Sequence, residues 1–213
     1  YGADVAPPRP VRFLSPPVAL GRLHPDIHGW ERFGRDHSGG QPDGTPIKPY
    51  VEGAWMTKHG GRYYLQYGAP GTEFHAYANG VWVSDNPLGP FEYADWNPIS
   101  YKPGGFVEGA GHGSTFQDRH GNWWNTGTSW VGYNWGMERR IAMYPVKFYE
   151  DGQMSAFSRF GDFPHYAPTS KIDDPESLFT GWMLLSYRKA ATPSSTMGEF
   201  AADRATDENP RTL

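Results

Sequence analysis

Short apolar segments separated by glycine- and proline-rich turns run through most of this chain. Apolar and polar residues alternate within them as they do in half-buried strands. The predicted strands cover residues 54–59, 62–68, 80–84, 91–93, 114–117, 123–126, 140–144 and 178–190. His59-Gly60-Gly61 is predicted to be a tight turn between two of these strands, and residues 31–49, rich in charges, Gly and Pro, to be a loop. The pattern therefore predicts an all-β fold.

Two segments 56 residues apart in the chain resemble each other. Val51-Glu52-Gly53-Ala54-Trp55 is echoed by Val107-Glu108-Gly109-Ala110-Gly111, and short strands with Gly-rich turns follow both. Such self-similarity is typical of the blades of a β-propeller. A β-sandwich would have similar strands without the echo, so the pattern favours a propeller over a sandwich.

The composition supports many short strands and excludes several functions. Glycine (27) and proline (20) make up about a fifth of the 213 residues, and 9 Trp, 13 Tyr and 12 Phe supply large apolar surfaces. A net charge of −4 with no basic run argues against nucleic acid as a partner. No apolar stretch approaches the ~18 residues of a membrane span. The absence of cysteine excludes thiolate catalysis and disulfides.

Glu52 is the main candidate for chemistry. It stands directly before the apolar run 54–56, and a tyrosine-rich strand follows. A lone carboxyl at the mouth of a small β-meander, backed by aromatic surface, suits a general acid that acts on a sugar. From spacing alone, a solvated acid before a strand is the alternative.

Residues 50–67, together with the Gly-His-x-Ser pattern at 111–114, resemble glycoside hydrolase family 43. The resemblance implies a five-bladed β-propeller, of which residues 1–190 would form the later blades. It also implies that Glu52 is the general acid of a glycosidase that inverts the anomeric centre. An aspartate base and a second, pKa-tuning aspartate would precede the acid on earlier blades. Asp26 lies only 26 residues before Glu52, so we expect both aspartates upstream of Tyr1.

The resemblance further implies hydrolysis of O-glycosidic bonds in poly- or oligosaccharides of plant type that contain arabinose, xylose or galactose. An inverting pair of carboxyl groups lies roughly 6.5–9.5 Å apart. Trp55 beside the acid is a candidate sugar platform, because C–H faces of sugars pack on aromatic rings. Glu73, His75 and Tyr77 are predicted to lie in the loop after residue 68 and to contact substrate, with a plain solvent loop as the alternative.

The Gly-His-x-Ser resemblance implies that His112 lies near the propeller axis, where it would contact substrate or help to hold a metal ion. Calcium is the ion considered, since one His suits it only within a mostly hydrated shell; no cofactor is required. Glu108 is a second acid or a rim residue. Arg139 and Arg140 offer a guanidinium to the axis or pair with Glu138 at the surface.

The last segment, residues 191–213, is predicted to be a linker followed by the start of a discoidin-type carbohydrate-binding domain. The chain opens without Met or a signal peptide, and we expect a secreted or periplasmic protein whose signal lies outside these residues. The 213 residues alone are expected to be inactive and prone to self-association, because neighbouring blades and the base are missing.

Two alternatives to the glycosidase remain open. A propeller without catalytic activity could bind glycans through the same aromatic face. A propeller enzyme with a histidine acid would shift the catalytic role from Glu52 to His75 or His112.

Overall fold

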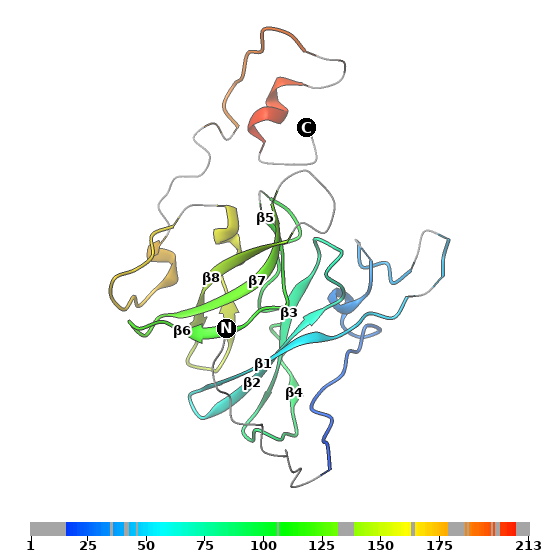
Figure 1. The fold of residues 1–213 in the computed structure, drawn as a ribbon, viewed down its shortest axis with the longest axis vertical. Coiled ribbons are helices and arrows are strands. Elements are labelled where there is room, and N and C mark those ends of the chain that lie inside the picture. Colours follow the sequence, from blue (N-terminus) through cyan, green and yellow to red (C-terminus); the bar gives the residue numbers. More distant parts are fainter. Residues whose placement is uncertain are drawn as a thin grey trace, which may run out of the picture.

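The computed structural model describes two antiparallel β-sheets that lie face to face (Figure 1). The described residues are 16–34, 36–40, 43–45, 47–105, 107–131, 139–162, 165–178, 186, 188–196, 198 and 201–207. Within them, the only helical elements are the 3-10 turns Gly29–Glu31 (η1), Ser158–Asp162 (η2), Pro175–Leu178 (η3) and Ala202–Thr206 (η4). The predicted all-β fold is confirmed.

The first sheet is a four-stranded meander. Its strands, in spatial and chain order, are β1 (Glu52–His59), β2 (Arg62–Ala69), β3 (Ala78–Ser84) and β4 (Glu92–Tyr93). His59 pairs with Arg62, and Gly60 and Gly61 between them have φ values of 56° and 85°. Two left-handed residues in a two-residue loop suit the twist of a hairpin and favour glycine at both places. The predicted tight turn is thereby confirmed.

The second sheet repeats this arrangement with a divided first strand. It consists of β5 (Val107–Gly111), β6 (Thr115–Gln117), β7 (Trp123–Val131), β8 (Arg140–Phe148) and β9 (Met154–Ala156). Both β5 and β6 pair with β7, which pairs with β8, and β8 pairs with β9. A four-strand antiparallel meander is the arrangement of a propeller blade.

The sequence echo corresponds to a repeated β-bulge. The register shifts between Glu52 and Trp55 on β1, and again between Glu108 and Gly111 on β5. In each bulge the glycine that follows the glutamate, Gly53 or Gly109, is left-handed, with φ of 65° and 76°. Glycine adopts this conformation at little cost, which explains why Glu-Gly recurs at the start of both sheets.

The main core lies between the two sheets. Buried side chains from both sheets meet there, among them Tyr64, Val81, Ala110, Tyr144, Val146 and Met154. A polar contact crosses the same interface, where Gln66 Oε1 accepts hydrogen bonds from Thr115 Oγ1 at 2.8 Å and from Asn125 Nδ2 at 2.9 Å. These contacts join β2 of the first sheet to β6 and β7 of the second.

The other face of the first sheet is covered by the N-terminal part of the described chain. Leu20, Leu23 and Trp30 pack on a cluster of Leu65, Tyr67 and Trp82. The covering segment is fastened by Glu31, whose fully buried carboxylate accepts hydrogen bonds from Tyr67 Oη and from the backbone N–H of His24, both at 2.6 Å.

The strand predictions differ from the structure mainly in length. The strands predicted at 123–126 and 140–144 continue to Val131 and Phe148, because backbone pairing runs on through Gly127 and the polar residues beside it. The short strand β9 was not predicted, because three residues are too few to show the alternation of apolar and polar positions that marks a strand. Most of the strand predicted at 178–190 falls outside the described residues.

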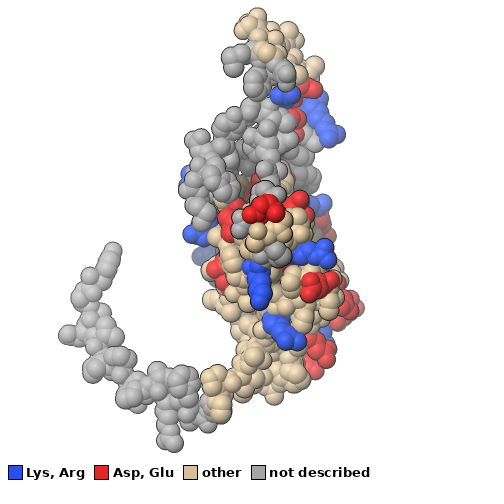
Figure 2. All heavy atoms as spheres, turned by 90° about the vertical axis from the view of Figure 1, so that its right-hand side faces the viewer, with Lys and Arg blue, Asp and Glu red and all other residues tan. Residues whose placement is uncertain are grey.

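Two further features concern the surface and the tail. On the side shown in Figure 2, basic side chains lie among acidic ones rather than in a patch of their own. No helix in the described part of the chain is long and apolar enough to cross a membrane.

Near the C-terminus, the backbone N–H of Arg188 bonds to the carbonyl of Thr206, so η4 folds back on residues 188–189. The discoidin-type domain remains a prediction.

Candidate active site

Three predicted residues meet where the two sheets begin. Glu52 opens β1, Tyr77 ends the loop before β3, and His112 directly follows β5. Tyr77 Oη donates a hydrogen bond of 2.6 Å to Glu52 Oε1, and His112 Nδ1 lies 3.7 Å from the same oxygen. The Glu52 side chain keeps 35% of its surface exposed and that of His112 keeps 49%. The carboxyl group is thus both held by the protein and open to a ligand.

Glycines make this close approach feasible. A Cβ atom on Gly68 would lie 2.6 Å from Tyr77 Oη, and one on Gly111 would lie 2.5 Å from the Tyr77 ring. A Cβ on Gly53 would lie 2.9 Å from the imidazole of His112. Real Cβ atoms do not come this close to other heavy atoms, so glycine at these positions creates the space that the cluster fills.

Tyr77 is a buried hydrogen-bond donor. Its side chain is fully buried, and burial, then the hydrogen bond to Glu52 and the charge of that carboxylate, raise the pKa of Tyr77 well above its usual range. The phenol therefore keeps its proton and donates a hydrogen bond to Glu52 Oε1. A buried hydroxyl reaches a substrate only through Glu52, so the structure does not test the predicted contact between Tyr77 and substrate.

A second carboxylate lies beside this cluster. Glu73 Oε2 accepts a short hydrogen bond from Tyr50 Oη, and Phe33 packs against the Tyr50 ring at 6.0 Å between centroids. Burial, the bond to Glu73 and the negative charges of Glu73 and Glu52 raise the pKa of Tyr50. The carboxylates of Glu73 and Glu52 thus both raise the pKa of the Tyr50 phenol. Sequence reasoning missed Tyr50, for which an aromatic residue just before the strand was the only signal.

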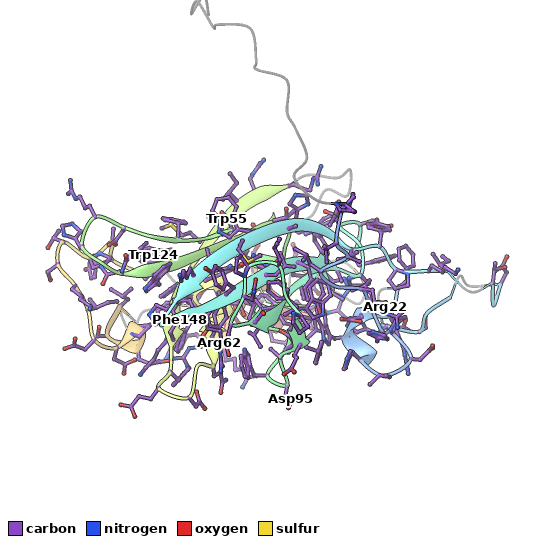
Figure 3. All side chains as sticks on the ribbon, turned by 90° about the horizontal axis from the view of Figure 1, so that it is seen from below. Arg22, Trp55, Arg62, Asp95, Trp124 and Phe148 are labelled. Carbon is purple, nitrogen blue, oxygen red and sulfur yellow. The ribbon has the colours of Figure 1, made fainter. Side chains whose placement is uncertain are left out.

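The remaining predicted residues lie around the cluster. Trp55 is 43% exposed on β1, and its indole N–H donates a 2.7 Å hydrogen bond to the carbonyl of Thr115 (Figure 3). His75 is half-buried in the loop before Tyr77. Arg139 lies close enough for its charge to lower the pKa of Tyr77 against the dominant effect of burial, and its Nη1 is 3.4 Å from Thr72 Oγ1. Glu138, its alternative partner, is outside the described residues.

The described side chains around His112 would supply few of the ligands of a calcium ion, so such an ion would be held mostly by water, as the sequence analysis considered. Calcium takes six to eight oxygen ligands, whereas one carboxylate, that of Glu52, lies within ion-pair range of His112. In the described ranges, no group of three or more His, Asp or Glu side chains could hold a metal ion.

A sequence model described as glycosyl hydrolases family 43 matches residues 39–154, which is more than half of the chain. The chain belongs to glycoside hydrolase family 43. The matched range holds both sheets up to the start of β9 and all the predicted site residues. In this family-43 chain, each of the two sheets is a meander of the kind that forms a propeller blade, which fits the propeller that the resemblance implied.

Known proteins similar to this family-43 chain include a curated relative named xylosidase/arabinosidase from Bacteroides ovatus. The two are 39% identical over 57 residues, which is 24% of this chain and 16% of the relative. Thus the chain matches only about a sixth of that relative's length.

Two solved structures are also similar to it. The family-43 protein BlXynB from Bacillus licheniformis is 27% identical, with a TM-score of 0.46 over 52% of this chain and 22% of that one. An endo-1,4-beta-xylanase from Bacteroides thetaiotaomicron is 27% identical, with a TM-score of 0.45 over 50% of this chain and 37% of that one. Because both TM-scores are below 0.5, the family assignment rests on the sequence model.

Proposed function

We propose that this chain carries the general acid of a glycosidase that acts on xylan- or arabinan-type glycans, with Glu52 as that acid. The observation that supports it most is the state of the Glu52 carboxyl within a family-43 chain. One oxygen is held by a buried phenol, while a third of the side chain faces solvent. A carboxyl group that is held in place and yet open to a ligand suits a general acid.

In the proposed reaction, Glu52 in its protonated form lies against the glycosidic oxygen. As the bond from the anomeric carbon to that oxygen breaks, the bonding electrons pass to the oxygen and the proton of Glu52 follows them. Water adds to the anomeric carbon from the opposite face and gives a proton to a second carboxylate, with inversion. We assign that base role to no residue described here.

The substrate class rests on the relative named xylosidase/arabinosidase, and the linkage and the sugar are therefore part of the proposal. Around Glu52, the exposed rings of Trp55 and Tyr50 offer surfaces on which a sugar could pack. Substrates of this kind fit a secreted or periplasmic protein. The C-terminal segment is proposed as the start of a further carbohydrate-binding unit.

The test is hydrolysis by the full-length protein of xylo- and arabino-oligosaccharides, with products followed by chromatography. Glu52→Gln should reduce turnover by at least 100-fold, because general acid catalysis contributes about 10²–10⁴-fold. Glu92→Gln is the matched control, since Glu92 is an exposed glutamate on β4 of the same sheet. Binding without any hydrolysis by the unaltered protein would instead favour a glycan-binding propeller.

A further inference from the structure

Among the described residues, two side chains contact the Glu52 carboxyl group, and both converge on one of its two oxygens. Tyr77 Oη is 2.6 Å from Oε1, and His112 Nδ1 is 3.7 Å from the same atom. We propose that Tyr77 is a positioning residue that occupies Oε1, so that Oε2 is the oxygen that gives the proton to the leaving group. This inference rests on the proposed function and adds an atomic assignment to it.

The burial of Tyr77 makes it suited to this role. Its ring fills the space beside Gly111, and its hydroxyl fills the space beside Gly68. None of the side chain is exposed. A ring enclosed in this way has one position for its hydroxyl, so the orientation of the bonded carboxyl is fixed as well. Catalytic groups held by buried partners keep the geometry that proton transfer needs.

The chemistry of a carboxyl group then assigns its two oxygens. A protonated carboxyl has a single O–H, and its other oxygen is an acceptor. Since Tyr77 donates to Oε1, the proton of the acid form is on Oε2, the oxygen that accepts no hydrogen bond from the described residues. That proton passes to the glycosidic oxygen as the carbon–oxygen bond breaks.

Tyr77 also favours the product of this transfer. When the proton leaves Oε2, Glu52 becomes a carboxylate, and the hydrogen bond from Tyr77 changes from one to a neutral acceptor into one to an anion. Bonds of the second kind are roughly twice as strong. A contact that strengthens as charge develops lowers the barrier of the chemical step rather than improving substrate binding.

The test is a kinetic comparison of Tyr77→Phe with the unaltered full-length protein on aryl xylosides or arabinosides. With a basic leaving group, kcat should fall about 10- to 100-fold, as expected for a lost hydrogen bond to a charged group, while KM changes less than threefold. With an activated leaving group the fall in kcat should be less than threefold. The alkaline limb of the pH–rate profile should move to higher pH, since the phenol no longer favours the carboxylate.

Two further variants separate positioning from a general loss of structure. Gly68→Ala leaves the Tyr77 ring intact but places a Cβ 2.6 Å from its hydroxyl, and it should reproduce the leaving-group dependence of Tyr77→Phe. Tyr67→Phe removes an equally short bond to a different carboxylate, that of Glu31, and should leave both the leaving-group dependence and the pH profile unchanged.

Equal losses on both leaving groups, or an effect confined to KM, would overturn the positioning role. If Glu52→Gln abolishes hydrolysis while Tyr77→Phe leaves kcat and the pH profile unchanged, this inference fails and the proposed function stands. If Glu52→Gln leaves hydrolysis intact, the proposed function itself fails.

Discussion

Tyr67 and Tyr77 make two similar hydrogen bonds to glutamates that are buried to different extents. Each phenol donates to a glutamate oxygen at 2.6 Å, Tyr67 to Glu31 and Tyr77 to Glu52. Both tyrosines are buried, and burial raises the pKa of each, so each keeps its proton. The acceptors differ, because Glu31 is fully buried whereas Glu52 keeps 35% of its side chain exposed.

This difference sets the expected cost of replacing each tyrosine by phenylalanine. After Tyr67→Phe, the backbone N–H of His24 is the one donor to Glu31 left among the described residues, and the carboxylate is too deeply buried for water to replace the phenol. A hydrogen bond to a charged group contributes about 1.5–3 kcal/mol, and a buried group left unsatisfied costs at the upper end of this range. We therefore expect Tyr67→Phe to lower the free energy of unfolding by about 3 kcal/mol. For Tyr77→Phe, water can replace the lost donor, and we expect a loss of about 1 kcal/mol.

Urea-induced unfolding followed by tryptophan fluorescence measures both losses in the same protein. For a chain of this size, about 3 kcal/mol corresponds to a fall of roughly 6–12 °C in Tm, which calorimetry would detect as an independent check. Equal losses for the two variants, or a larger loss for Tyr77→Phe, would refute the reasoning that acceptor burial decides the cost.

Two further predictions concern local features of the second sheet and the site. Burial on its own would raise the pKa of Asp118, but hydrogen bonds from Trp124, Asn122 and the backbone of His120 outweigh it and lower that pKa to about 2. Because the folded-state pKa is below the ordinary 3.8, the stabilisation is complete above pH 4 to 5 and is lost as the pH falls towards 2. The pKa difference corresponds to about 2.4 kcal/mol, which screening at a partly exposed site reduces to about 1 kcal/mol. Asp118→Asn should therefore flatten the acid limb of a curve of stability against pH by about 1 kcal/mol. An unchanged acid limb would contradict this prediction. Gly111→Ala should lower the free energy of unfolding by at least about 2 kcal/mol, since its Cβ would lie 2.5 Å from the Tyr77 ring, whereas Gly104→Ala, with nothing within 4 Å, should be neutral in the same urea titration. Similar values for the two alanine variants would contradict the close packing around Tyr77.

Local features of the structure were predictable where one short segment determines them. His59-Gly60-Gly61 predicted the first hairpin, because two adjacent left-handed residues favour glycine. The Glu-Gly echo predicted a structural repeat, which proved to be a repeated bulge. Glu52 was singled out by its place before a strand together with the resemblance to family 43, and the structure adds its contacts with Tyr77 and His112.

Contacts between distant segments were beyond the sequence. Glu31 looked like one more loop charge, yet it is the fully buried partner of Tyr67, 36 positions later. The position of Tyr77 in a predicted loop did not reveal that its ring fills the space beside Gly111 or that its hydroxyl bonds to Glu52. Such pairings depend on how the two sheets and the covering segment pack, and single-segment patterns carry no information on that packing.

The general-acid role of Glu52 is tested most directly by the dependence of kcat/KM on the basicity of the leaving group. A series of aryl xylosides or arabinosides with increasingly basic phenols should be cleaved by the unaltered full-length protein at rates that change little, because Glu52 protonates the departing oxygen. Glu52→Gln should retain activity on the most acidic phenols and lose at least 100-fold on the most basic ones, which gives a steep dependence. A parallel loss across the whole series would contradict the assignment of Glu52 as the acid.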